Sequence, residues 1–114
     1  YGMGVHWALK SIKQFPDFSF QIVDLRSLLP WDKELVTDSV IKTNKVLILH
    51  EDTLTGGIGA EISAWINENL FKYLDAPVIR CASLDTPVPF NHEQEKQFLA
   101  NYWLKEKIEY LINY

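Results

Sequence analysis

The chain has 114 residues, of which 47% are hydrophobic and 13% aromatic, and its formal net charge at pH 7 is −4. This length predicts a single domain with enough apolar side chains for a hydrophobic core. No cluster of lysine and arginine residues occurs along the chain, which argues against a nucleic-acid-binding protein. No apolar stretch approaches the roughly 18 residues of a membrane-spanning helix, and no signal-peptide pattern opens the chain. The single cysteine, Cys81, excludes an internal disulfide and suits a reducing compartment.

The first 25 residues predict a helix followed by a strand. Apolar residues recur at helical spacing over Met3–Phe15, and Pro16 ends this helix because proline disfavours the helical conformation in the residue before it. The segment Phe18–Leu25 alternates at first and then becomes apolar, which predicts a strand. Tyr1–Gly4 has the pattern of a turn between a strand and a helix. We therefore expect a strand before Tyr1 and a longer parent chain.

Helices and strands alternate through the rest of the chain. The next helix is predicted to begin after a cap at Asp32 and to run to about Lys42. The apolar run Val46–Leu49 indicates a strand that is buried on both faces. The remaining predicted elements are a helix over Gly57–Leu74, a strand over Pro77–Ala82, a loop over Ser83–His92, a short helical turn over Glu93–Ala100 and a helix over Tyr102–Ile112. This order predicts a three-layer α/β/α domain with a mostly parallel sheet.

Three ionisable residues, His50, Glu51 and Asp52, directly follow the run Val46–Leu49. The carboxyl ends of strands border the functional crevice of open α/β sheets. These three residues are therefore the first candidates for a functional site. Adjacent residues on a strand point in alternating directions and do not chelate one metal ion together, and their spacing matches no zinc motif. The preferred interpretation is structural. One buried side chain is expected to be satisfied by hydrogen bonds, and the other two to cap or line the turn.

Three further patterns have both a functional and a structural interpretation. Gly2-x-Gly4-x-x-Trp7 begins like a dinucleotide-binding fingerprint, but a tryptophan prevents the close helix–strand contact required at the third position. The turn Gly56-Gly57-Ile58-Gly59 could cradle an anion at a helix amino terminus, or it could be a tight turn with close helix packing. Cys81 could form a nucleophilic triad with His50 and an aspartate, or it could be an inert buried thiol.

The helix predicted over Gly57–Leu74 is apolar around more than one stripe, and such a helix buries two surfaces. One surface is expected to contact the sheet. The other is expected to contact either a partner subunit or another helix of the same chain. Trp65 and Phe71 are of the residue types that anchor subunit interfaces, and with Gly56 and Gly57 they make up the expected subunit interface.

Several motifs occur in the order found in a known family. They are DLRSLLPWD at 24–32, HEDTLTGGIGAEI at 50–62, DAP at 75–77 and SLDTPVPF at 83–90. These motifs resemble the C-terminal, transketolase-like domain of the β subunit of 2-oxo acid dehydrogenases. HEDTLTGG and DTPVPF are most similar to the branched-chain (2-oxoisovalerate) type, and the pyruvate type is the near alternative. The resemblance implies a three-layer α/β/α fold whose first strand lies upstream of Tyr1.

The resemblance also implies a function. Enzymes of this family bind thiamine diphosphate and Mg²⁺, decarboxylate a 2-oxo acid and acylate the lipoyl group of the next component. Their cofactor, metal and acid–base residues lie in the preceding domains. The resemblance therefore implies a part of such an enzyme without catalytic, cofactor-binding or metal-binding residues of its own, and inactive alone. It implies a place in the cytoplasm, or in the mitochondrial matrix of a eukaryote.

In this family the C-terminal domain serves assembly. It contributes to the contact between β subunits, and in some members it docks the basic subunit-binding domain of the acyltransferase core. In those members the acceptors include an acidic residue before Ala-Pro and the carboxylate at the chain end, so the resemblance implies Asp75 and Tyr114 here. Two such carboxylates would orient a cationic partner. The structural alternative is a turn cap at Asp75 and a frayed terminus at Tyr114. His50 and Glu51 are expected to organise the turn that leads into the interface helix.

Two rival hypotheses stay open at this point. One is a free-standing α/β module that binds an anionic ligand at Gly56–Gly59. The other is a small hydrolase that uses Cys81 or a serine as its nucleophile.

Overall fold

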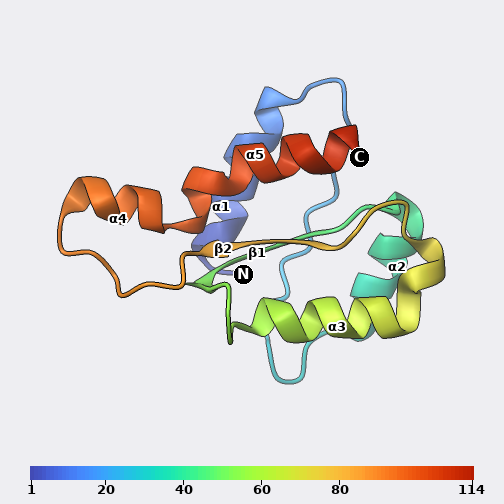
Figure 1. The fold of residues 1–114 in the computed structure, drawn as a ribbon. Helices are drawn as coiled ribbons and strands as arrows, with labels where there is room; N and C mark the ends of the chain where they lie inside the picture. Colours follow the sequence, from blue (N-terminus) through green and yellow to red (C-terminus); the bar gives the residue numbers. More distant parts are fainter.

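The computed structural model describes residues 1–114, and Figure 1 shows a small sheet between two layers of helices. In chain order the elements are α1 (Met3–Ser11), the 3₁₀ helix η1 (Ile12–Gln14), α2 (Lys33–Thr43), β1 (Leu47–Thr53), α3 (Ile58–Leu70), the 3₁₀ helix η2 (Phe71–Tyr73), β2 (Ile79–Ser83), α4 (His92–Phe98) and α5 (Ala100–Asn113). Helices α1 and α5 cover one face of the sheet, and α2 and α3 lie on the other. The predicted three-layer α/β/α fold is confirmed. None of the helices combines the length and the apolarity that crossing a lipid bilayer requires.

The sheet consists of two parallel strands. Leu47 of β1 pairs with Ile79 of β2, and Leu49 pairs with Cys81, before the register shifts ahead of the last pair, Thr53 and Ser83. Strand β1 is longer than predicted, because it continues through the three ionisable residues to Thr53. The predicted functional edge is therefore part of the strand and not of a loop.

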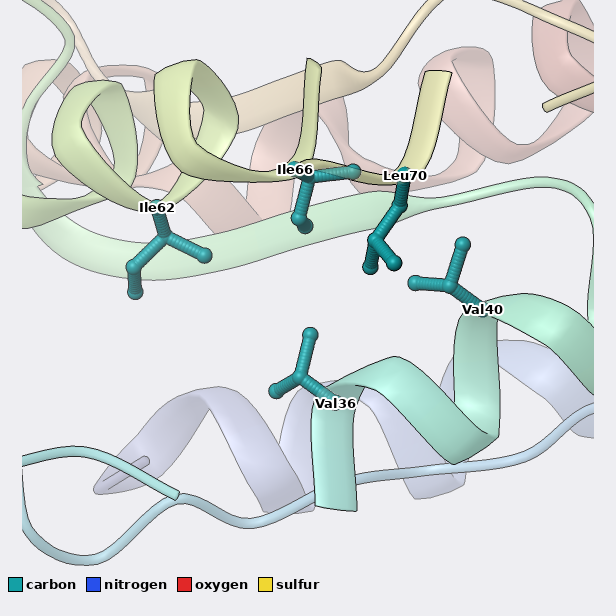
Figure 2. Packing of buried hydrophobic residues seen from close by; sticks show 5 residues of the cluster. All are labelled: Val36, Val40, Ile62, Ile66 and Leu70. Atoms are coloured by element: carbon teal, nitrogen blue, oxygen red, sulfur yellow. The ribbon is translucent and has the colours of Figure 1, made fainter. Parts of the chain in front are cut away.

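Alternation along β1 divides the apolar interior into two clusters. Val46 and Ile48 pack against the cluster between α2 and α3, whereas Leu47 and Leu49 pack against the cluster around α5. In Figure 2, Ile62, Ile66 and Leu70 of α3 extend toward the side chains from α2. These α2 residues are Val36 and Val40. Side chains of a strand point alternately to its two faces, so a continuous apolar run is what a strand between two helical layers requires.

Helix α2 is capped at both ends. The carboxylate of Asp32 accepts a hydrogen bond from the amide of Leu35 at 2.9 Å, which is the predicted amino-terminal cap. At the carboxyl end Asn44 adopts a left-handed conformation with φ of 61°, and its amide donates to the carbonyl of Val40 at 2.8 Å. This reversal directs the chain from α2 into β1.

The strand predicted over Phe18–Leu25 is wrong. This segment has no regular secondary structure, and only β1 and β2 form a ladder. A strand exists only where its backbone groups pair with a neighbour. An apolar cavity lies between this segment and β1, lined by Ile22 and Val23 on one side and by Leu47 and Leu49 on the other. The composition of Phe18–Leu25 suits a strand, but neither β1 nor β2 pairs with this segment.

Candidate functional site

Hydrogen bonds from the end of β2 and the loop after it hold the turn that follows β1. Thr55 donates to the carboxylate of Asp85 through its amide at 2.8 Å and through its hydroxyl at 2.6 Å. The guanidinium of Arg80 donates to the carbonyl of Leu54 at 2.9 Å, and the hydroxyl of Ser83 donates to the carbonyl of Glu51 at 2.5 Å. The two hydrogen bonds from Thr55 lower the pKa of Asp85. The turn is thus positioned by polar contacts with a segment about 30 residues further along the chain.

His50 is fully buried at this edge, and neither of its ring nitrogens has a hydrogen-bond partner. A Cβ atom added to Gly57 would lie 2.6 Å from Cε1 of His50, and one added to Gly59 would overlap the same ring. The imidazole of His50 therefore occupies the space that side chains at Gly57 and Gly59 would fill at the start of α3. The prediction that the buried polar residue is satisfied by hydrogen bonds is wrong for His50. Its ring packs against the Cα–H groups of Gly57 and Gly59, which offer no donor or acceptor. Burial lowers the pKa of His50 and favours the neutral ring.

Glu51 and Asp52 are exposed. The carboxylate of Glu51 would lie 3.5 Å from a Cβ atom on Gly2, so it sits beside the amino terminus of α1, where a negative charge is favourable. The carboxylate of Asp52 accepts a hydrogen bond from the amide of Thr53 at 2.8 Å. Both acids add to the effect of burial in raising the pKa of the Tyr1 phenol. His50, Glu51 and Asp52 thus make three different kinds of contact, and no three His, Cys, Asp or Glu side chains gather as a metal site.

The geometry does not support a Cys81 nucleophile. Cys81 is paired with Leu49 and packs in the α5 cluster, whereas His50, the next residue on β1, points to the α3 face. The Cys81 thiol donates to the carbonyl of Ala100 at 3.3 Å. Burial raises the pKa of Cys81 to about 11, so the thiol stays protonated at neutral pH.

The geometry also gives little support to an anion site at Gly56–Gly59. Helix α3 begins after Gly57 without a side-chain cap, and Gly56 has the left-handed φ of 79° that a tight turn needs. The carboxylates of Asp52 and Asp85 are hydrogen-bonded to Thr53 and Thr55 just before this turn, and their negative charge repels an anion. The guanidinium of Arg80 is bound to Leu54. The glycines instead allow the close approach of His50.

A second polar arrangement lies at the opposite, amino edge of the sheet. The amide of Asp75 donates to the carbonyl of Asn44 at 2.8 Å, and the side-chain amide of Asn44 donates to the carbonyl of Tyr73 at 2.7 Å. The ammonium of Lys45 donates to the last carbonyls of α5, those of Leu111 at 3.0 Å and Ile112 at 3.3 Å. Asn44 and Lys45 therefore hold the loop that carries Asp75 and the end of α5 that precedes Tyr114 on the same edge.

Sequence reasoning placed the end of the second helix at Thr43-Asn44, but it missed the contacts that Asn44 makes with the Tyr73–Asp75 loop and that Lys45 makes with the end of α5. Asparagine directly after a helix favours the left-handed cap, which is the only local signal at Asn44. The 66-residue separation between Lys45 and Leu111 left no local signal for the second contact. Asp75 and Tyr114 are both exposed, and no hydrogen bond or ion pair within the chain occupies the Asp75 carboxylate.

Comparison with known proteins agrees with this architecture. The family model described as "Transketolase, C-terminal domain" matches residues 1–103. The chain belongs to the transketolase C-terminal domain family. Both strands, helices α1 to α4 and the glycine-rich turn before α3 lie within the matched range, and most of α5 lies beyond it.

Curated relatives of this transketolase C-terminal domain are β subunits of dehydrogenases. The chain is 53% identical over 75 residues to "2-oxoisovalerate dehydrogenase subunit beta 2, mitochondrial" of Arabidopsis thaliana, covering 66% of the chain and 21% of the relative. It is 49% identical over 76 residues to "Pyruvate dehydrogenase E1 component subunit beta" of Gracilaria tenuistipitata var. liui, covering 67% and 24%. It is 40% identical over 104 residues to "2-oxoisovalerate dehydrogenase subunit beta" of Bacillus subtilis, covering 89% and 32%. The matched part thus spans about a fifth to a third of these relatives.

The expected interface residues of the domain differ in exposure. Trp65 is half-buried, and its ring meets Trp31 edge to face at 5.0 Å between centroids. The ammonium of Lys33 lies over both indole rings, at 5.7 Å from Trp31 and 5.4 Å from Trp65. Phe71 is 72% exposed at the end of α3. Trp65 therefore already has aromatic and cationic partners within the chain, whereas the ring of Phe71 is exposed to solvent.

Proposed function

We propose that this domain is the C-terminal assembly domain of a thiamine-diphosphate-dependent 2-oxo acid dehydrogenase of the 2-oxoisovalerate type. The family match and the identities to β subunits of that type support the proposal. The parent enzyme decarboxylates a 2-oxo acid and acylates a lipoyl group, with thiamine diphosphate and Mg²⁺ held by its other domains. The fragment alone is inactive. The parent acts in the cytoplasm, or in the mitochondrial matrix of a eukaryote.

The observation that carries the assembly role is the arrangement at the amino edge of the sheet. Asp75 is exposed, and its backbone amide is hydrogen-bonded to the carbonyl of Asn44. The next residue, Lys45, binds the end of α5. A carboxylate on a fixed backbone without a partner in its own chain can accept charge-assisted hydrogen bonds from arginine or lysine. We therefore assign Asp75 and Tyr114 to docking of the basic subunit-binding domain of the acyltransferase.

A second contact of the proposed assembly role joins β subunits. Phe71 is an exposed aromatic residue, and buried aromatic residues dominate the energetics of subunit interfaces. Trp65, Gly56 and Gly57 belong to the same helix or to the turn that precedes it. In this proposal α3 approaches a second β subunit with Phe71 as the anchor, and Trp65 lies at the margin because it is held by Trp31.

Docking is tested by calorimetric titration of the domain with the acyltransferase subunit-binding domain, at low and at high salt. We expect salt-sensitive binding that Asp75→Asn weakens about tenfold or more, because the substitution removes one charged partner. Asp38→Asn is the matched control, since Asp38 is an exposed aspartate on α2 without a hydrogen-bond partner. Equal losses for the two variants, or no binding by a folded sample, would contradict docking at this edge. Sedimentation of the same samples measures self-association.

A further inference from the structure

Two adjacent residues close two helices that lie far apart in the sequence. Asn44 ends α2 in a left-handed conformation, and its amide donates to the carbonyl of Val40 at 2.8 Å. Lys45 caps the end of α5, because its ammonium donates to the carbonyls of Leu111 at 3.0 Å and Ile112 at 3.3 Å. The two residues that lead into β1 therefore contact the ends of helices from opposite layers of the domain (Figure 1).

Lys45 is the cation that the end of α5 itself lacks. The last carbonyls of a helix have no partner within it and carry partial negative charge, yet the last turn of α5 contains no basic residue. Beyond Leu111 no side chain of α5 is fully buried. The hydrogen bonds from Lys45, a half-buried residue 66 positions away from Leu111, therefore hold the helix end that precedes Tyr114.

Asn44 holds the loop that carries Asp75 through two hydrogen bonds. Its side-chain amide donates to the carbonyl of Tyr73 at 2.7 Å, and its carbonyl accepts from the amide of Asp75 at 2.8 Å. These bonds reach the loop on both sides of Leu74. The backbone of Asp75 is therefore fixed relative to the start of β1, whereas its carboxylate is exposed.

We propose that Asn44 and Lys45 are positioning residues of the docking site. Asn44 orients Asp75. Lys45 orients the end of α5, which precedes Tyr114. This inference rests on the docking role proposed above. Because the two residues are adjacent in the chain, they fix both acceptors relative to one another before the acyltransferase subunit-binding domain arrives, and a preformed site loses less conformational entropy on binding.

Positioning and electrostatics predict opposite effects of removing Lys45. A lysine close to the acceptors for a basic partner opposes binding through its charge, so electrostatics alone predicts a tighter complex without it. A lysine that positions the end of α5 supports binding, so the complex becomes weaker without it. The direction of the change therefore distinguishes the two roles.

Calorimetric titration of the chain with the subunit-binding domain at low salt measures this direction. We expect Lys45→Met, which keeps a side chain of similar length without its charge, to raise the Kd about fivefold. Lys45→Arg keeps a cationic donor and should stay within about twofold of the unsubstituted chain. Lys42→Met is the control, because Lys42 is an exposed lysine in the last turn of α2 without a hydrogen bond or ion pair, and it should not raise the Kd.

Combination with Asp75→Asn tests Asn44. Asn44→Gly retains the left-handed conformation, which glycine adopts freely, and removes the hydrogen bond to Tyr73. We expect Asn44→Gly to raise the Kd about threefold in the unsubstituted chain and to have little further effect in Asp75→Asn, because the residue that it positions is already changed. Lys45→Met should weaken binding equally in both backgrounds. Additive effects of Asn44→Gly and Asp75→Asn would overturn the role of Asn44.

Failure of docking and failure of positioning give different results. No binding by the folded, unsubstituted chain would overturn the docking role and this inference with it. Binding that Lys45→Met leaves unchanged or tightens would leave docking intact and overturn the role of Lys45. NMR spectra check that each variant is folded. If Lys45→Met does not fold, Lys45→Gln, which keeps a neutral donor, is titrated in its place with the same expected direction.

Discussion

At the scale of single residues, His50 accounts for the glycines that follow it. Its ring occupies the space into which side chains at Gly57 and Gly59 would extend. Any larger residue there forces either the imidazole or the helix to move, and overpacking of this kind costs about 1–3 kcal/mol. The glycine-rich turn therefore serves the close approach of α3 to β1.

The buried imidazole predicts a pH dependence of stability. The pKa of His50 is lowered in the folded protein by burial, while in the unfolded chain it is about 6.5. Below that pH the unfolded chain takes up a proton that the folded protein does not. The free energy of unfolding should therefore decrease as the pH falls from about 7 toward 5, by at most about 1.4 kcal/mol per pH unit from this group.

Urea unfolding at a series of pH values measures this dependence. His50→Phe keeps a ring at the site and removes the titration, so its curve should be flatter over the same range. His6 and His92 are exposed and present in both proteins. A decrease of the same slope in the variant would show that other groups cause it.

At the scale of elements, α2 illustrates how local signals define a helix. Asp32 caps its amino terminus, and Asn44 reverses the chain at its carboxyl terminus. Only Val36 and Val40 of this helix are fully buried, both against α3. With so small a buried face, the caps provide a substantial share of the stability of α2.

We expect Asp32→Ala to lower the free energy of unfolding by about 1 kcal/mol, because the amide of Leu35 loses its acceptor. Chemical denaturation measures the loss. Asp38→Ala, in the exposed middle of the same helix, should change stability by less than about 0.5 kcal/mol. Similar effects of the two substitutions would mean that the cap contributes nothing beyond the loss of a charge.

At the scale of the whole molecule, two apolar clusters pack on opposite faces of one short two-stranded sheet. The α2–α3 cluster packs against Val46 and Ile48 of the chain at β1, and the α5 cluster packs against Leu47 and Leu49. Cys81 lies in the second cluster and is 1% exposed. Its thiol is reached by solvent only when α5 leaves the sheet.

Cys81 therefore reports on the opening of the domain. Burial and the raised pKa of about 11 should make its reaction with a thiol reagent at pH 8 at least about a hundredfold slower in the folded chain than in urea-unfolded chain. Adding subdenaturing urea should accelerate labelling in parallel with the unfolding constant. Rapid labelling without urea would show that α5 separates from β2 in the native state.

The sequence by itself determined the order of helices and strands from Asp32 onward, the Asp32 cap and the family. These features depend on periodicity and on contacts within one turn of helix, which a linear pattern records. Only the tertiary structure decided that Phe18–Leu25 forms no strand, that His50 has no hydrogen-bond partner, and that Asn44 and Lys45 bring the Asp75 loop and the end of α5 to one edge. Each of these features depends on whether a segment distant in the sequence offers a hydrogen-bond partner to a polar group. That depends on three-dimensional packing, which a linear pattern does not record.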